Sequence, residues 1–84
     1  MTERLTNFLN ELARSGGQRW YPPTSASEDE QAAFQSEVND LRRLDRSGDI
    51  NIINEQKESH SGNRYVVQML IEMIDGEEWL AAQG

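Results

Sequence analysis

Few side chains in this sequence have the types and spacing that catalysis requires. The 84 residues include one histidine, His60, and no cysteine, which excludes a cysteine nucleophile and a cysteine-based metal site. His60 falls in a polar run where we expect an exposed loop tip. No serine sits in a nucleophile-elbow pattern, and Ser15-Gly16-Gly17 lacks the lysine and the spacing of a phosphate-binding loop. We therefore predict no catalytic residue, no cofactor and no small-molecule substrate.

Two acidic clusters have the chemistry to bind a metal ion or to transfer a proton. Residues 28–30 read Glu-Asp-Glu, and residues 77–78 read Glu-Glu. Each cluster follows a good helix N-cap, Ser27 or Asp75, and each has a glutamate three residues after that cap, as in a capping box. Acids in a first turn also stabilise the positive end of the helix dipole. We interpret both clusters as helix starts, and predict neither a metal site nor an enzyme.

The charge balance disfavours polyanionic partners. The net charge is −7, and residues 21–40 contain five acids and no basic residue. Such a field repels phosphate backbones and anionic lipid, although a local basic patch could still act within a Debye length of about 8 Å. No stretch approaches the ~20 apolar residues of a membrane span, and the N-terminus lacks the apolar run of a signal peptide. We expect a cytoplasmic protein with no membrane partner.

Any functional surface must be positioned by the elements around residues 65–74, YVVQMLIEMI. If this segment is extended, its apolar side chains occupy both faces: Val67, Met69, Ile71 and Met73 on one, and Val66, Leu70 and Ile74 on the other. This pattern predicts a strand covered on both faces, in the centre of a small sheet. A helix over 65–82 is the alternative, because several of the same side chains fit its period. Dense β-branching favours the strand.

Two amphipathic helices are expected before this strand. The first follows the N-cap Thr2 and ends at Gly16 and Gly17, and the second runs from Ser27 to Gly48. Apolar side chains recur at helical spacing in both: Leu5, Phe8, Leu9 and Leu12, then Phe34, Val38, Leu41 and Leu44. Each helix therefore has one face to bury.

The segments around these helices are predicted to be extended. Residues 18–21 end in Trp-Tyr before two prolines, which favours a short edge strand, and a proline-rich ligand is the alternative. Residues 49–53 begin a hairpin whose turn is expected at Gly62-Asn63. That turn predicts three opposed pairs: Ile52 with Met73, Gln56 with Met69, and His60 with Tyr65. The first arm is mostly polar, so the outer half of the hairpin should project into solvent.

The last ten residues of the sequence are compatible with two structures. Asp75 as N-cap favours a short C-terminal helix that carries Trp79 and Leu80 back onto the core. The alternative is an Asp-Gly hairpin leading into residues 77–80. We favour the helix because the acids at 77–78 suit its first turn.

This order of elements resembles a winged helix-turn-helix domain. Residues 41–50, LRRLDRSGDI, are similar to the end of a recognition helix running into the first wing strand. Residues 71–80, IEMIDGEEWL, are similar to the last wing strand running into a terminal helix. The resemblance implies an α+β fold over residues 1–84 as a single domain. It would have two main helices, a three-stranded antiparallel sheet with a β-hairpin wing, and a short C-terminal helix, and would place 65–74 between the other two strands.

The sequence departs from that family at one place. The family has two helices between the short strand and the wing, whereas this chain has room for one long helix. We therefore expect the first helix of the helix-turn-helix to be reduced to one turn within Pro22–Ser27, or to be missing. Either outcome weakens the pair of helices that docks on DNA.

The resemblance implies a candidate DNA-binding surface. Glutamine and asparagine in a recognition helix can pair with adenine, but the acids at 28–30 would face phosphates. The candidate DNA contacts are Gln31, Gln35, Asn39, Arg42, Arg43, Arg46, Lys57, His60 and Arg64. The net charge disfavours DNA binding, whereas the resemblance to a winged helix-turn-helix domain favours it. A DNA-binding regulator is therefore our alternative hypothesis.

Large adaptable apolar side chains give the leading hypothesis. Such side chains are common at protein interfaces, and here they are Trp20, Tyr21, Met69, Met73 and Trp79. The competing reading is that these residues complete the core of one monomer. We predict a non-enzymatic protein-interaction or adaptor module that binds a protein partner or itself. The economical homodimer would pair the face of the first helix with its copy across a two-fold axis.

Overall fold

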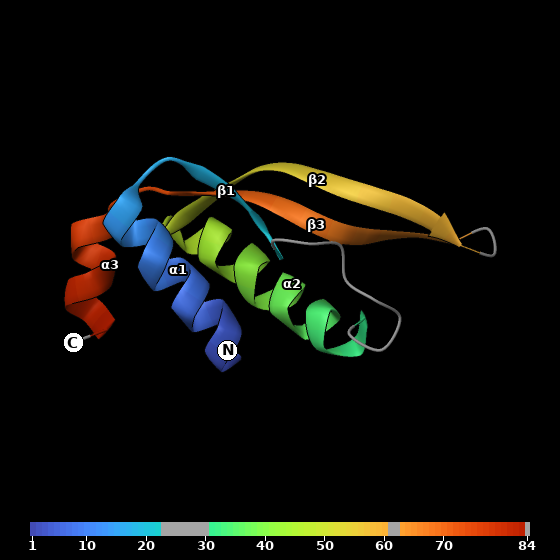
Figure 1. The fold of residues 1–84 in the computed structure, drawn as a ribbon, viewed down its shortest axis with the longest axis horizontal. Helices are drawn as coiled ribbons and strands as arrows, with labels where there is room; N and C mark the ends of the chain where they lie inside the picture. The colour runs from blue at the N-terminus through green and yellow to red at the C-terminus, as the bar shows by residue number, and fades with distance from the viewer. Residues whose placement is uncertain (23–30, 61–62, 84) are drawn as a thin grey trace.

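In the residues that the structure describes, a three-stranded antiparallel sheet is combined with three helices, the α+β architecture predicted above (Figure 1). The computed structural model describes residues 1–22, 31–60 and 63–83, with the backbone alone at 31–32, 59–60, 63–65 and 83. The elements in chain order are α1 (Glu3–Ser15), β1 (Gln18–Tyr21), α2 (Gln31–Ser47), β2 (Ile50–His60), β3 (Asn63–Met73) and α3 (Gly76–Gln83). None of the three described helices is long and apolar enough to cross a membrane.

The apolar segment predicted to be central is the middle strand. The sheet has the order β1-β3-β2, and β3 pairs antiparallel with both neighbours. This confirms a strand rather than a helix over this segment. Residues 23–27, where a reduced helix was expected, lie outside the described residues, as does the predicted start of α2 at 27–30.

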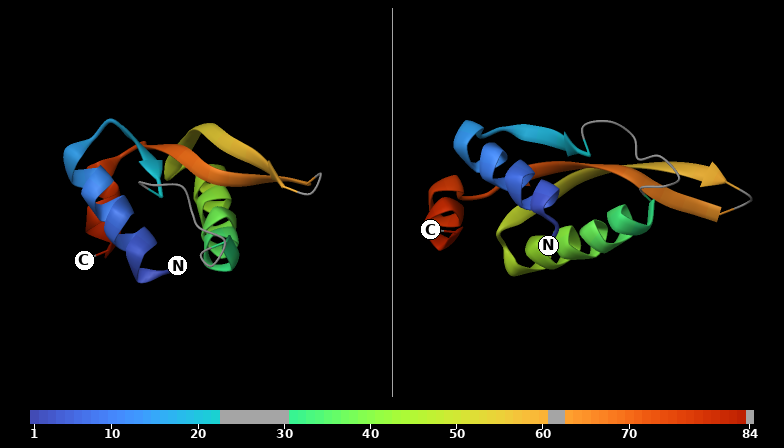
Figure 2. Two further views of the ribbon diagram at one scale, coloured as in Figure 1. Left: turned by 45° about the vertical axis from the view of Figure 1, so that its right-hand side comes forward. Right: turned by 60° about the horizontal axis from the view of Figure 1, so that its bottom comes forward.

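This strand was predicted to be covered on both faces. The described helices cover one of them (Figure 2), and Val66 and Val67, predicted on opposite faces, are both buried. α1 and α2 lie on the same face of the sheet, and α3 packs beside α1 (Figure 2). On the opposite face Leu70 is half-buried, because it lies in the central strand between β1 and β2. Ile74 follows the last residue of β3 and is 51% exposed. Among the described residues, no helix packs on this outer face (Figure 2).

Two irregularities change which side chains of the hairpin face the core. Ile52 opposes Ile71 but Asn54 opposes Leu70, so β2 has an extra residue at Ile53. On β3 the extra residue is Val67, because Gln56 opposes Gln68 and Lys57 opposes Val66. An inserted residue reverses the alternation beyond it. Val66 therefore joins the core cluster with Met69 and Ile71, contrary to the predicted faces.

The predicted register of the hairpin is also wrong. The observed pairs are Ile50 with Met73, Glu55 with Met69, Glu58 with Tyr65, and His60 with Asn63. Asn63 is thus the first residue of β3 rather than part of the turn. The two extra residues lie on opposite strands and offset each other, so Ile50 and Met73 pair in the same register as His60 and Asn63. The hairpin still projects beyond the helices, as its polar first arm predicted (Figure 1).

Local capping fixes the helix ends as predicted. The Thr2 hydroxyl accepts a hydrogen bond from the Leu5 N–H at 3.3 Å. Asp75 Oδ1 accepts from the Glu78 N–H at 3.0 Å, which confirms the C-terminal helix over the hairpin alternative. Gly16 and Gly48 follow α1 and α2 with φ of 70° and 89°, a conformation that other residues rarely adopt.

One core cluster draws on all six elements. The helices contribute Leu5, Leu9, Leu12, Phe34, Val38, Leu41 and Trp79, and the strands contribute Tyr21, Ile50, Val66, Met69 and Ile71. Trp79 also donates its indole N–H to Asn10 Oδ1 at 3.0 Å, which ties α3 to α1. α1 and α2 lie on one side of the sheet (Figure 2), and the far edge of β2 has no partner strand among the described residues.

Candidate protein-interaction surface

The free side of β2 is the most prominent unpaired feature of the sheet. This strand has 11 residues, and one side pairs with β3 while the other has no partner among the described strands. A long edge strand presents a row of backbone N–H and C=O groups that can pair with another chain. Ile53, at the extra residue of β2, is 44% exposed. A hollow of about 430 Å³ lies here, and its described lining residues come from this strand: Ile52, Ile53, Asn54, Glu55 and Lys57.

This edge carries opposite charges two residues apart. Glu55 is half-buried and Lys57 is exposed, with 4.0 Å between Lys57 Nζ and Glu55 Oε2. The Arg42 guanidinium from α2 also reaches Glu55, with Nη2 at 3.0 Å from Oε1. Glu55 opposes the core residue Met69, so both charges lie on the helical face of the sheet. The edge is therefore polar, with balanced positive and negative charges, rather than apolar.

The outer face of the sheet is mixed. Trp20 opposes Leu70, and both side chains are half-buried, which makes a small apolar centre. The neighbouring row is polar, because Glu72 accepts hydrogen bonds from Gln18 Nε2 at 3.2 Å and from Asn51 Nδ2 at 3.4 Å. These bonds join all three strands across the face. The hydrogen bonds on the outer face thus hold the three strands together, but this face offers limited apolar area to a protein partner.

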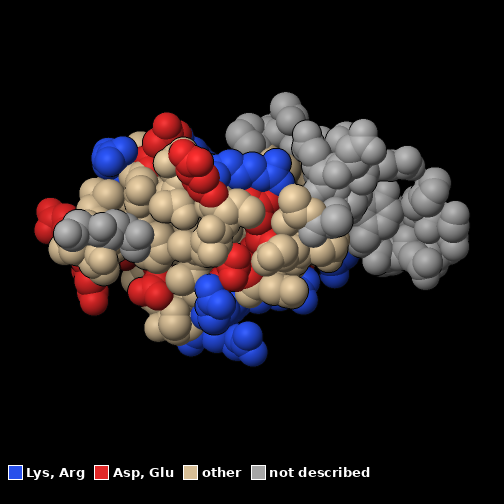
Figure 3. All heavy atoms as spheres, turned by 90° about the horizontal axis from the view of Figure 1, so that it is seen from below, with Lys and Arg blue, Asp and Glu red and all other residues tan. Residues whose placement is uncertain are grey.

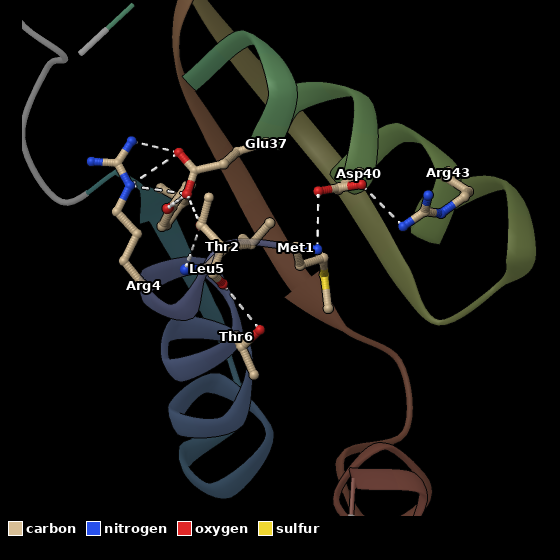
Figure 4. Close-up of polar contacts among 9 residues, drawn as sticks. Met1, Thr2, Arg4, Leu5, Thr6, Glu37, Asp40 and Arg43 are labelled. Carbon is tan, nitrogen blue, oxygen red and sulfur yellow. Dashed lines mark hydrogen bonds and ion pairs between the residues drawn. The ribbon is translucent and has the colours of Figure 1, made fainter. Parts of the chain in front are cut away.

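A buried carboxylate links α1, β1 and α2 on the helical face (Figure 4). Glu37 is fully buried, at 0% exposure. Arg4 Nε lies 3.1 Å from Glu37 Oε1 and 2.9 Å from Oε2, and Arg4 Nη2 also donates to Oε1. The hydroxyls of Thr2 and Tyr21 both donate to Oε2. With both oxygens already occupied by donors, this carboxylate joins elements and has little capacity to accept a proton from a substrate.

Burial and hydrogen bonding shift two pKa values in this cluster. Burial opposes ionisation of Glu37, but hydrogen bonds from Arg4, Thr2 and Tyr21 and the Arg4 charge outweigh it, so its pKa is lowered. Burial raises the pKa of Tyr21, and the hydrogen bond to Glu37 and its negative charge raise it further. The cluster thus holds an ionised Glu37 and a neutral Tyr21 at pH 7.

Sequence reasoning missed Glu37, although a signal was present. Position 37 lies three residues after Phe34 and four before Leu41, on the apolar stripe of α2. A charged residue at such a position is buried only when it has partners. Its partners come from α1 and β1, which sequence spacing does not place.

No protein-family model matches the chain, and comparisons with curated proteins and with solved structures found no match either. Within the described residues, no group of three or more His, Asp and Glu side chains is arranged to hold a metal ion. What the protein binds therefore has to be inferred from its own surfaces.

Three of the predicted interface residues are core residues instead. Tyr21, Met69 and Trp79 are buried in the cluster formed by the monomer itself, so their role as an interface is ruled out by their burial. Met73 is partly buried against the same cluster, and Trp20 remains half-buried on the outer face. The competing reading, that these residues complete the core of one monomer, thus holds for three of the five. The apolar side chains of α1, the helix expected to pair with its copy, are buried in the same cluster: Leu5, Leu9 and Leu12.

The candidate DNA contacts on α2 form one exposed stripe. Gln35, Asn39, Arg42 and Arg46 are exposed and recur every three or four residues, and Arg43 is exposed beside them. Asn39, Arg42, Asp45 and Arg46 line a surface hollow of about 460 Å³. The predicted contacts Gln31, His60 and Arg64 have side chains outside the described set.

Acidic neighbours offset most of the basic groups around this stripe. Arg42 pairs with Glu55 at 3.0 Å, Arg43 Nη2 lies 3.0 Å from Asp40 Oδ1, and Lys57 shares Glu55. Figure 3 shows basic side chains along the lower edge of the helical face, with acidic side chains close by. Among the basic candidates with described side chains, Arg46 alone has no ion pair within the described part of the chain. These pairs weaken the local attraction for phosphate.

Proposed function

We propose that this domain is a non-enzymatic protein-interaction module that assembles with a second copy of itself through the free edge of β2. The observation that carries the proposal is the 11-residue strand with one side unpaired among the described strands. Addition of a strand to such an edge supplies main-chain hydrogen bonds along its whole length. The exposed Ile53 adds apolar area at the same edge.

A second copy is the partner that fits this edge with the fewest assumptions. A two-fold axis makes the same patch serve both subunits and closes the assembly at two copies. The edge carries both a carboxylate and an ammonium group, Glu55 and Lys57, so an antiparallel copy can match unlike charges. Pairing would also protect an edge that otherwise favours uncontrolled association.

Sedimentation equilibrium over a range of concentrations tests the proposal. We expect Ile53→Glu to weaken self-association by at least about tenfold, because it replaces apolar area at the edge with a charge that would lose its water when the two edges pair. The matched control is Ile74→Glu, at a residue of similar exposure that lies beyond the end of β3, and it should associate like the native chain. Equal affinities for the two variants would contradict the use of this edge.

The exposed stripe on α2 supports a second candidate function, DNA binding by a winged-helix-like domain. Arg46 is its strongest phosphate contact, because the other basic candidates with described side chains, Arg42, Arg43 and Lys57, are paired within the chain. A pool of short duplexes should be retarded in a gel at low salt, with affinity falling steeply as salt rises. Arg46→Glu should abolish the shift, whereas Arg14→Glu, at an exposed residue of α1, should preserve it. If no duplex is retarded even at low salt, this candidate is excluded.

A further inference from the structure

We infer that the two copies pair β2 with β2 in a single antiparallel register, centred on Gln56. The inference rests on the proposed function and specifies how the two edges meet. In this register Glu55 opposes the partner's Lys57, and Lys57 opposes the partner's Glu55. Asn54 opposes the partner's Glu58, and the two Gln56 side chains meet at the two-fold axis.

Side-chain direction limits the available registers. Opposed residues of an antiparallel pair point to the same face of a sheet, and side chains alternate along a strand. A symmetric pairing must therefore be centred on a residue, and its axis is perpendicular to the sheet. Such an axis keeps the helices of both copies on one face of a continuous sheet.

The extra residue at Ile53 further limits the position of the two-fold axis along β2. Regular pairing on β2 runs from Asn54 towards His60, so the centre should fall within that part of the strand. Centring on Glu55, Lys57 or Glu58 would place that charged side chain directly opposite its own copy, which is destabilising. Centring on Gln56 instead opposes unlike charges on both sides of the axis. Charge complementarity thus selects this register.

Disulfide trapping tests the register directly, since the native chain has no cysteine. Opposed Cα atoms of an antiparallel pair are about 4.5 to 5.5 Å apart, within the range that a disulfide spans. Gln56→Cys should therefore form a covalent dimer rapidly under mild oxidation. Asn54→Cys alone and Glu58→Cys alone should not, but an equimolar mixture of the two should form the mixed dimer. Positions 54, 56 and 58 are exposed, so these variants should fold normally.

The outcomes separate the register from the proposed function. If the native chain dimerises and Ile53→Glu weakens it, but Asn54→Cys or Glu58→Cys alone cross-links as fast as Gln56→Cys, the register is wrong and the function stands. If the native chain remains monomeric at every concentration, both fail. Cross-linking by Gln56→Cys together with the mixed 54–58 dimer supports both.

A charge exchange gives an independent check of the same register. Glu55→Lys and Lys57→Glu should each weaken association by about tenfold, because each places like charges opposite one another twice. In an Arg42→Ala background, where residue 55 no longer faces the guanidinium of α2, the double variant that exchanges the two charges should recover most of the affinity of the Arg42→Ala chain. If the double variant associates no better than the single variants, Glu55 and the partner's Lys57 are not opposed.

Discussion

Glu37→Ala is expected to lower the free energy of unfolding by about 3 kcal/mol. Removing one member of a buried, hydrogen-bonded ion pair leaves the other polar groups without a partner, and such losses are about 3–5 kcal/mol. Here the hydroxyl of the buried Tyr21 would lose its acceptor, whereas Arg4 is partly exposed and can donate hydrogen bonds to water. The expected loss is therefore near the lower end of that range. Urea denaturation measures the change directly.

The control for this variant is Glu37→Gln, which keeps the size and one acceptor oxygen and should cost less. The pH dependence provides a second readout. Because the folded pKa of Glu37 is lowered, its contribution is present above the unfolded value of about 4.3 and is lost as the pH falls through the folded pKa. Glu37→Gln should therefore flatten the acid side of the stability profile. A loss below about 1 kcal/mol for Glu37→Ala would show that the cluster does not hold the helices together.

Gly76→Val is expected to destabilise the fold by about 3 kcal/mol, because α3 begins in direct contact with α1. A Cβ at Gly76 would lie 2.3 Å from the Ala13 carbonyl oxygen and 3.0 Å from its carbonyl carbon. Backbone atoms cannot rotate away as a side chain can, so the helices must separate, and overpacking of this kind costs about 1–3 kcal/mol or more. The midpoint of urea denaturation should fall accordingly.

Ala81→Gln is the matched control for this substitution. It adds side-chain volume at an exposed site in the same helix and should change stability by less than about 0.5 kcal/mol. An unchanged urea midpoint for Gly76→Val would contradict the close approach of α3 to α1.

Those features of the fold that depend on neighbouring residues were predictable from the sequence. Thr2, Gly48 and Asp75 mark helix boundaries through hydrogen bonds or backbone conformations that each residue type favours. The apolar density of 65–74 correctly indicated the central strand, because that strand has a neighbour on each side.

The errors arose where distant segments determine the outcome. The extra residues at Ile53 and Val67 leave no local sequence signal that we recognised, yet the one at Val67 moves Val66 into the core. Burial of Glu37 likewise depends on Arg4 and Tyr21, which lie far away in sequence. Composition alone could not divide large apolar residues between core and interface, so Tyr21, Met69 and Trp79 were assigned to a surface they do not reach.

The mass of the native chain in solution is the most direct test of the central claim that β2 joins two copies. Sedimentation equilibrium at neutral pH should give a mass that rises with concentration from 9.6 kDa towards twice that value and then levels off. A mass that stays at the monomer value across the whole range would contradict the claim.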